Sequence, residues 1–188
     1  MSKIITLTAI AAVSEDWGIG KDGDLLFNIP EDKKFFRDTT IGHKVIMGRK
    51  TFGSLPNGKP LPCRENIILS HNNLHIEGNS VLYHDVNNIL KNVSKELDFL
   101  SNYEECFVIG GGEISKLLLP YCKRAIITRV RASPEADTFF PNLDDDWDWV
   151  NVKETEEKEY NGLKYKFVYY DRIMKSVQVK RQEMNSNE

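Results

Sequence analysis

An apolar run near the start of the chain restricts the possible folds more than any other feature. Residues 3–13 are largely apolar, and Ile4, Thr6 and Thr8 among them are β-branched. Such a run is typical of a strand buried on both faces, as in a largely parallel sheet. A secretory signal can look similar, but this run leads directly into glycines rather than into a spacer. We therefore predict a buried strand over residues 3–13.

Strands and helices then alternate along the chain. Residues 86–100 place isoleucine, leucine and valine at helical spacing, which predicts an amphipathic surface helix. The turn residues Asn161 and Gly162 lie between the strand-like stretches 147–154 and 163–173, which predicts an antiparallel hairpin. Together these elements predict an α/β sheet that is parallel with an antiparallel edge. Further strands are predicted over 43–48, 66–70, 80–83, 106–109 and 124–131, and further helices over 30–42, 49–55 and 113–119.

The composition is that of an ordinary globular domain. The chain has 188 residues, of which 40% are hydrophobic and 28% charged, and its net charge is −3. Because there is no basic excess to neutralise phosphates, we expect no nucleic-acid partner. No apolar run approaches the roughly 18 residues of a membrane span, so we expect no membrane partner. We predict one domain over residues 1–173 and a frayed polar extension over 174–188.

The cysteines and histidines show no pattern that would hold a metal ion. Cys63, Cys106 and Cys122 are odd in number and lack metal or redox spacing, and the histidines at 43, 71, 75 and 84 lack zinc spacing. We therefore predict no metal site, reduced thiols and a cytoplasmic location. No large apolar surface segment is evident in the sequence, so we expect a monomer.

Residues 18–36 combine a glycine-rich stretch, which we predict to be a loop, with an acidic helix start. Glycines at 18, 20 and 23 permit turns, and Pro30 marks the first turn of the helix that follows. On that helix Phe35 and Phe36 lie three and four residues after Asp32, so one carboxylate shares a face with two rings. A carboxylate on an apolar wall can bind a flat nitrogen heterocycle. An ordinary acidic helix start is the alternative, and this stretch alone leaves it open.

Two strand-to-helix junctions have the character of phosphate sites. One carries Arg49 and Lys50 directly after a strand, and the other is a run of three glycines that begins at Gly110. Each could also be a simple tight turn, and the glycine run does not complete the dinucleotide-binding pattern because position 115 is serine. Two separated anion sites suit a nicotinamide dinucleotide that carries a 2′-phosphate. Arg64 is a third cation, suited to a substrate carboxylate or to the surface.

Several of these segments together resemble the dihydrofolate reductase family. The resemblance covers about residues 3–172 and depends on the order of its motifs rather than on any single one. The motifs are Ile-Ala-Ala-Val-Ser, Gly-Ile-Gly-Lys-Asp-Gly-Asp-Leu, Val-Ile-Met-Gly-Arg-Lys-Thr-Phe, Leu-Pro-Cys-Arg-Glu-Asn-Ile-Ile-Leu-Ser, Val-Ile-Gly-Gly-Gly and Ala-Asp-Thr-Phe-Phe-Pro.

The resemblance implies a fold, a reaction and a substrate site. The fold is a mostly parallel eight-stranded sheet with an antiparallel C-terminal edge strand and flanking helices. The reaction reduces 7,8-dihydrofolate to tetrahydrofolate by hydride transfer from NADPH, which supplies one-carbon metabolism and thymidylate and purine synthesis. Asp32 and Thr128 match the catalytic residues, and Arg64 matches the arginine that binds the glutamate tail. The other substrate-binding residues implied are Ile10, Ala11, Leu25, Phe27, Phe36, Leu55, Leu61 and Ile109.

The resemblance also implies a cofactor site and a cis peptide between two of its glycines. We expect the 17–26 stretch to close over the nicotinamide and exclude water, with Asp32 orienting the pterin while the proton arrives through solvent. The cofactor-binding residues implied are Ala12, Ile19, Gly20, Gly48, Arg49, Lys50, Thr51, Leu69, Ser70, His71, Ile109, Gly110, Gly111, Gly112, Glu113 and Ile114.

Three positions depart from the family pattern. Leu26-Phe27 stands where Pro-Trp is common, and Phe27 lacks the indole N–H that could hold a water. Ser115 replaces a usual tyrosine, and Glu113 would repel a pyrophosphate if aimed at it. Two other functions stay open: a pyrimidine reductase of the riboflavin pathway with the same fold and cofactor, and a non-catalytic pterin- or nucleotide-binding protein. Asp32 beside Phe36, together with Arg64, favours the folate substrate.

Overall fold

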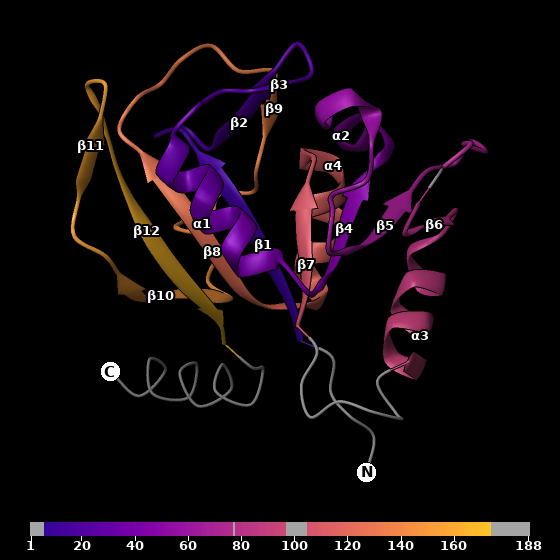
Figure 1. Cartoon of the computed structure of the whole chain (residues 1–188). Helices are drawn as coiled ribbons and strands as arrows, with labels where there is room; N and C mark the ends of the chain where they lie inside the picture. The colour runs from indigo at the N-terminus through magenta and orange to yellow at the C-terminus, as the bar shows by residue number, and fades with distance from the viewer. Residues whose placement is uncertain (1–5, 77, 97–104, 174–188) are drawn as a thin grey trace, which may run out of the picture.

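One large sheet runs through the computed structural model, which describes residues 6–76, 78–96 and 105–173 (Figure 1). Its strands lie in the order β10–β12–β8–β1–β7–β4–β5–β6, and β11 pairs with β12 outside this path. The bounds are β1 Thr6–Val13, β4 Lys44–Gly48, β5 Glu65–Leu69, β6 Ser80–Tyr83, β7 Glu105–Gly110, β8 Cys122–Val130, β10 Trp149–Glu154, β11 Lys158–Tyr160 and β12 Leu163–Arg172.

The sheet is parallel except at the side formed by the C-terminal strands. β1 pairs in parallel with β7 and β8, and β4 pairs in parallel with β5 and β7. β12 runs antiparallel to both β8 and β10, and β10 takes the outermost position. The predicted sheet, mostly parallel and with an antiparallel C-terminal strand at one edge, is confirmed.

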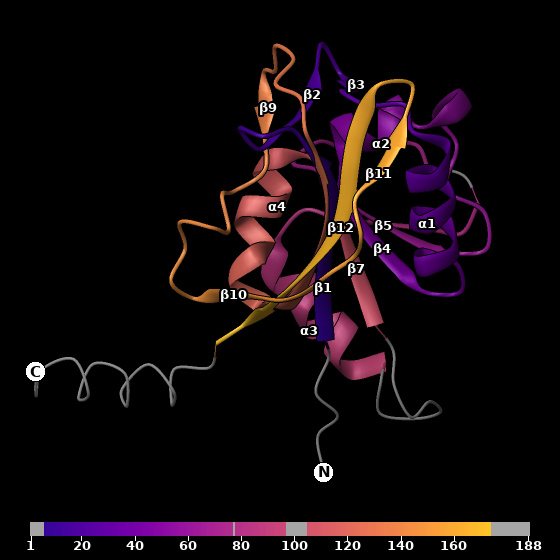
Figure 2. The ribbon, with the colours of Figure 1, turned by 90° about the vertical axis from the view of Figure 1, so that its left-hand side faces the viewer.

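Helices cover both faces of the sheet because its central strands are apolar on both faces. All five residues of β4 are buried. α1 (Pro30–Thr40) and α2 (Arg49–Ser54) pack on one face, and α3 (Val86–Glu96) and α4 (Gly112–Leu118) on the other, as Figure 2 shows for α1 and α4. Parts of three predicted elements lie outside the described residues. They are residues 3–5 of the first strand, residues 97–100 of the 86–100 helix and the extension over 174–188.

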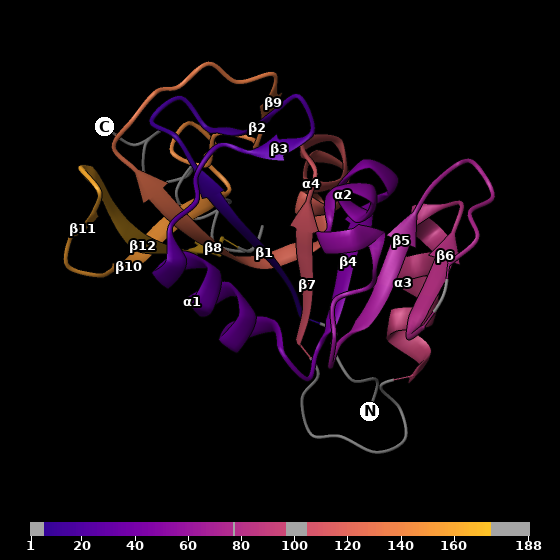
Figure 3. The same cartoon turned by 45° about the horizontal axis from the view of Figure 1, so that its top comes forward.

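The glycine-rich stretch forms a small sheet rather than the predicted loop. β2 (Gly18–Lys21) pairs antiparallel with β3 (Asp24–Leu25) and with β9 (Thr138–Phe139). Asp22 and Gly23 make the turn between β2 and β3 with positive φ angles of 53° and 86°. Figure 3 shows the three strands side by side above the end of β1. The partner strand comes from a distant part of the chain, so local sequence could not reveal it.

Candidate active site

The carboxylate of Asp32 meets the hydroxyl of Thr128 inside the fold. Asp32 lies in the first turn of α1, and Thr128 lies on β8 with 3% of its surface exposed. Thr128 Oγ1 donates a hydrogen bond of 2.6 Å to Asp32 Oδ1, although the two residues are 96 positions apart. Pro30 at the start of α1 and the acidic first turn suit the positive end of the helix dipole. The structure therefore brings the two residues predicted as catalytic into direct contact.

Burial controls the acidity of Asp32. Desolvation raises the pKa of its carboxyl above the ordinary value of 3.8, while the Thr128 hydrogen bond and the charge of Lys33 act in the opposite direction. A carboxyl group with a raised pKa binds its proton more tightly in the folded than in the unfolded state. Its contribution to folding therefore worsens as pH rises through the folded-state pKa, and at neutral pH the ionised carboxylate reduces stability.

The Asp32→Asn variant should consequently be more stable than the wild-type protein at neutral pH. The amide keeps the shape of the side chain but has no charge to desolvate. We expect a higher Tm at pH 7 that approaches the wild-type value as pH falls below 3.8, where the wild-type carboxyl becomes protonated in both the folded and the unfolded state. Calorimetry of the ligand-free protein over this pH range checks it. An equal or lower Tm at pH 7 would show that the Thr128 hydrogen bond outweighs desolvation.

Most of the predicted pocket wall forms one apolar cluster. Ile10, Phe36, Leu55, Leu61 and Ile109 all belong to the cluster around Val45, Met47, Ile68 and Phe107. Phe27 packs instead in a neighbouring cluster around Ile29, and Ala11 packs in the cluster on the other face of the sheet. Leu25 lies on β3 and is 74% exposed, so the described contacts do not place it in the wall.

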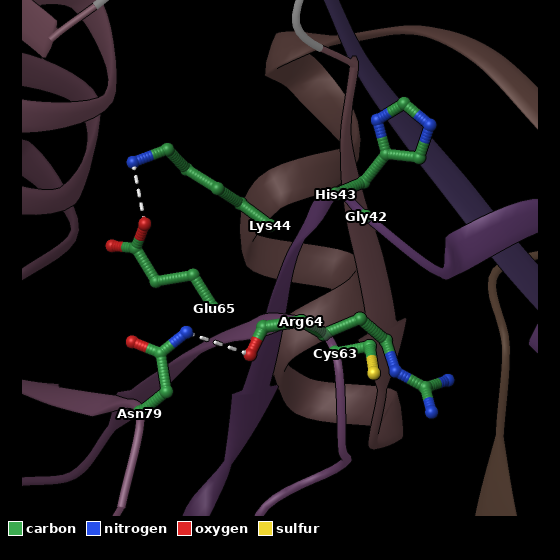
Figure 4. A pocket seen from close by; sticks show the side chains of 7 residues that line it. All are labelled: Gly42, His43, Lys44, Cys63, Arg64, Glu65 and Asn79. Carbon is green, nitrogen blue, oxygen red and sulfur yellow. Dashed lines mark hydrogen bonds and ion pairs between the residues drawn. The ribbon is translucent and has the colours of Figure 1, made fainter.

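Arg64 is a buried cation held by two oxygen atoms. Its Nε donates to Pro62 O at 2.9 Å and its Nη1 to Thr40 Oγ1 at 3.1 Å, and burial lowers its pKa. A cavity of about 210 Å³ beside it is lined by residues 42–44, 63–65 and 79. In Figure 4 the Arg64 guanidinium points away from the Lys44–Glu65 ion pair, while Asn79 Nδ2 donates to the Arg64 carbonyl oxygen.

A second cation near Arg64 was missed in the sequence. After burial, the charge of Arg37 is a further cause of the lowered pKa of Arg64. Arg37 and Thr40, the partner of Arg64, lie three residues apart on α1 and so share a face of the helix. This spacing was the signal that could have identified Arg37.

The predicted cofactor segments meet at the carboxyl ends of three adjacent strands. Gly48, at the end of β4, pairs with Leu69, at the end of β5, and Met47 pairs with Gly110, at the end of β7. This edge is where open parallel sheets bind ligands. The remaining predicted residues lie on β1 (Ala12), β2 (Ile19, Gly20), α2 (Arg49, Lys50, Thr51), after β5 (Ser70, His71), after β7 (Gly111) and on α4 (Gly112, Glu113, Ile114).

The glycines and cations at this edge suit an anionic cofactor. The expected cis peptide lies between Gly110 and Gly111, and a Cβ added to Gly111 would lie 3.3 Å from Thr51 Oγ1. A side chain at Gly111 would crowd Thr51, and the glycine leaves the backbone open where a pyrophosphate would approach it. Arg49 and Lys50 are exposed, and within the described ranges neither forms an ion pair. The residues present therefore fit a phosphorylated dinucleotide.

The three family departures lie in different environments. Phe27 is half-buried, and Ser115 is buried in α4, where its backbone N–H donates to Gly111 O at 2.9 Å. Glu113 is exposed in the first turn of α4. Exposure gives its carboxylate room to lie away from a bound phosphate.

A carboxylate on the 131–140 loop fastens the small sheet, and sequence reasoning missed it as a functional residue. The Asp22 backbone N–H donates to Asp137 Oδ2 at 2.8 Å, and this hydrogen bond is the main reason that the pKa of Asp137 is lowered. Lys21 and Glu135 add an ion pair between the same two segments. These contacts hold the 18–25 hairpin against β9.

Removing the Asp137 carboxylate should therefore slow the reaction. In Asp137→Ala the hairpin loses a charge-assisted hydrogen bond, and we expect hydride transfer to fall by about tenfold. Stopped-flow measurement of the transfer step checks this. Asp145→Ala is the matched control, because Asp145 is an exposed carboxylate whose partner, Asn142, lies outside the small sheet. Equal rates in the two variants would contradict a role for Asp137.

The comparisons with known proteins decide which family has this arrangement. The family model described as dihydrofolate reductase matches residues 6–172. The chain belongs to the dihydrofolate reductase family. It is 38% identical over 168 residues to the dihydrofolate reductase of Bacillus subtilis, covering 88% of this chain and 94% of that protein. It is 34% identical over 169 residues to that of Haemophilus influenzae, covering 89% and 99%.

A solved dihydrofolate reductase also shares the fold. The enzyme from Enterococcus faecalis, complexed with NADP(H) and RAB-propyl, aligns with a TM-score of 0.77 and 31% identity, covering 90% of this chain and 97% of that one. The family, the fold class and the reduction of dihydrofolate to tetrahydrofolate with NADPH, all predicted from the sequence, are confirmed by these matches. The roles of individual dihydrofolate reductase residues in this chain stay predictions.

Proposed function

We propose that Asp32 is the residue that binds and polarises the pterin during this reduction. The observation that carries the proposal is the hydrogen bond from Thr128 to Asp32 Oδ1 in a largely apolar surrounding. Among the described residues no side chain or backbone group donates to Asp32 Oδ2, so this oxygen can accept from the 2-amino group and N3 of a pterin. Phe36, on the same helix face as Asp32, supplies an apolar wall for the ring.

Hydride transfer also requires a proton for the neighbouring ring nitrogen. NADPH supplies the hydride when bound at the carboxyl ends of β4, β5 and β7. Asp32 orients and polarises the pterin from the far side of the ring, so the proton arrives through solvent rather than directly from its carboxyl. The small sheet, in which Asp137 holds the 18–25 hairpin against β9, is the segment that would exclude bulk water from the reacting faces.

The cofactor and tail contacts follow from the positions of the cations and glycines. We assign the pyrophosphate to Gly110, Gly111 and Gly112 and the 2′-phosphate to Arg49 and Lys50. We assign Ala12 on β1 and Ile19 on β2 to the wall of the nicotinamide site. Arg64, fixed by Thr40, binds the carboxylate of the glutamate tail bidentately.

An absorbance assay tests the proposed substrate site. Purified protein should oxidise NADPH when 7,8-dihydrofolate is present and stop when a diaminopyrimidine antifolate is added. A pyrimidine substrate of the riboflavin pathway should give no turnover. Turnover with the pyrimidine substrate instead would favour the reductase of that pathway, and ligand binding without turnover would favour a binding protein.

We further infer that the protein acts as a cytoplasmic monomer whose catalytic unit is residues 1–173. The family match ends at residue 172, and all three cysteines are free thiols. The net charge of −3 gives no electrostatic basis for binding nucleic acid. None of the helices in the described part of the chain is long and apolar enough to cross a membrane. Light scattering of the full chain tests whether the protein is a monomer. Turnover by a variant that ends at residue 173 tests whether residues 1–173 are the catalytic unit.

A further inference from the structure

Two neighbouring faces of α1 do different things. Asp32 contacts Thr128 and Phe36 lies in the pocket cluster, and these residues are four apart on one face of the helix. Glu31 and Phe35, also four apart, lie on the adjacent face and contact β12, and Phe35 packs against the pocket cluster as well. The first face carries Asp32, the proposed pterin-binding residue, and the second attaches the helix to β12 of the sheet.

Glu31 is held by two residues of the C-terminal hairpin. The Tyr165 hydroxyl donates to Glu31 Oε2 at 2.7 Å, and Lys158 Nζ contacts Glu31 Oε1. Lys158 and Tyr165 are directly opposite one another in the β11–β12 pairing, so they reach the carboxylate from one site. Lys158, followed by Tyr165, lowers the pKa of Glu31, while burial and Glu31 raise that of Tyr165 to about 12. At neutral pH Glu31 is thus ionised and Tyr165 keeps its proton.

The same strand also positions the partner of Asp32. The Phe167 ring packs at a tilt of 34° against the ring of Phe35, with ring centroids 4.2 Å apart. Phe35 lies one turn along α1 from Glu31. Phe167 is paired with Thr128 in the register between β12 and β8. β12 therefore fixes Thr128 through the sheet and α1 through Tyr165 and Phe167. Both ends of the Asp32–Thr128 hydrogen bond depend on one strand.

We propose that Glu31, held by Tyr165 and Lys158, is a positioning residue that sets the rotation of α1 and so aims Asp32 at the substrate. This rests on the role proposed above for Asp32. A side-chain oxygen of Asp32 lies about 5 Å from the axis of a helix such as α1. If the helix rotated by about 20°, this oxygen would move by roughly 2 Å, which is more than a hydrogen bond tolerates. Tyr165 is 2% exposed, so its hydroxyl is a rigid anchor for the helix.

Binding of the two ligands separates positioning from general stability. Tyr165→Phe removes only the hydroxyl, and we expect the Kd of dihydrofolate to rise by about tenfold while that of NADPH stays within about twofold. Lys158→Met, at a more exposed site, should raise the dihydrofolate Kd by about threefold. Glu31→Gln keeps an oxygen that accepts from Tyr165, so it should bind dihydrofolate more tightly than Glu31→Ala.

Lys166→Met is the matched control. Lys166 lies on β12 and pairs with Glu154, but this pair does not contact α1. It should leave both Kd values unchanged. Wild-type binding of dihydrofolate by Tyr165→Phe and Glu31→Ala would overturn the proposal, and so would an equal rise in both Kd values. If Tyr165→Phe does not fold, the dihydrofolate Kd values of Lys158→Met, Glu31→Gln and Glu31→Ala test the proposal instead.

Asp32→Asn, measured in parallel, separates this proposal from the one on which it rests. If Asp32→Asn retains wild-type turnover, the role of Asp32 is wrong and the positioning role falls with it. If Asp32→Asn loses turnover while the Glu31 and Tyr165 variants bind dihydrofolate as tightly as the wild type, only the positioning role is wrong.

Discussion

Replacing Asp32 by asparagine should lower the rate of hydride transfer at neutral pH by on the order of 100-fold. The amide preserves side-chain volume, and its oxygen can still accept the hydrogen bond from Thr128. It has no negative charge, however, with which to polarise the pterin. A single-turnover measurement with saturating NADPH and dihydrofolate isolates this step from product release.

Asp38→Asn is the control for this experiment. Asp38 is an exposed carboxylate on the same helix and pairs with Lys34 at 2.6 Å. Its loss should leave the rate within about twofold, because the described partners of Asp38 are the exposed Lys34 and Arg37, and exposed pairs of this kind contribute little to the position of the helix. A wild-type rate in Asp32→Asn at neutral pH would rule out the assigned role. The same variant is expected to have a higher Tm. A slower hydride transfer together with a higher Tm would show that the Asp32 carboxylate contributes to catalysis and lowers the stability of the fold.

The second large effect is expected at Gly112. A Cβ added there would overlap the carbonyl oxygen of Phe139 and lie 3.2 Å from Thr138 Cγ2. Because the obstacle is backbone of β9, Gly112→Ala should displace the small sheet and destabilise the protein by about 1–3 kcal/mol. The same displacement disturbs the glycines assigned to the pyrophosphate. We expect the Kd of NADPH to rise by about tenfold or more, measured by fluorescence titration.

Gly53→Ala distinguishes this steric effect from the general effect of adding a methyl group. Gly53 lies in α2, and apart from its chain neighbours and the backbone of its own helix no atom lies within 4 Å of an added Cβ. Alanine is the better helix former, so this variant should be as stable as the wild type or more stable by up to about 1 kcal/mol. NADPH bound by Gly112→Ala as tightly as by Gly53→Ala would disprove the close-contact argument.

Local sequence determined the elements and the edge of the sheet at which they meet. β6 occupies the predicted residues 80–83, and β4 begins one residue after the prediction. Strands buried on both faces are continuously apolar, so the sequence pattern identifies them. The carboxyl ends of parallel strands lie at one edge of the sheet, and the motifs that follow residues 48, 69 and 110 therefore meet there. The family resemblance added Asp32 and Thr128 as a pair, which spacing alone could not have matched.

Only the tertiary structure decided which polar groups support the site. Asp137 reaches Asp22 across 115 positions, and Tyr165 reaches Glu31 across 134. The carboxylates in these pairs lie on the surface or at a helix start, where acidic residues are common for local reasons, so neither pair has a distinctive pattern in the sequence. Apolar periodicity encodes which side of an element is buried. The partner of a single hydrogen bond depends on where distant backbone segments come together, and that is settled only when the sheet is assembled.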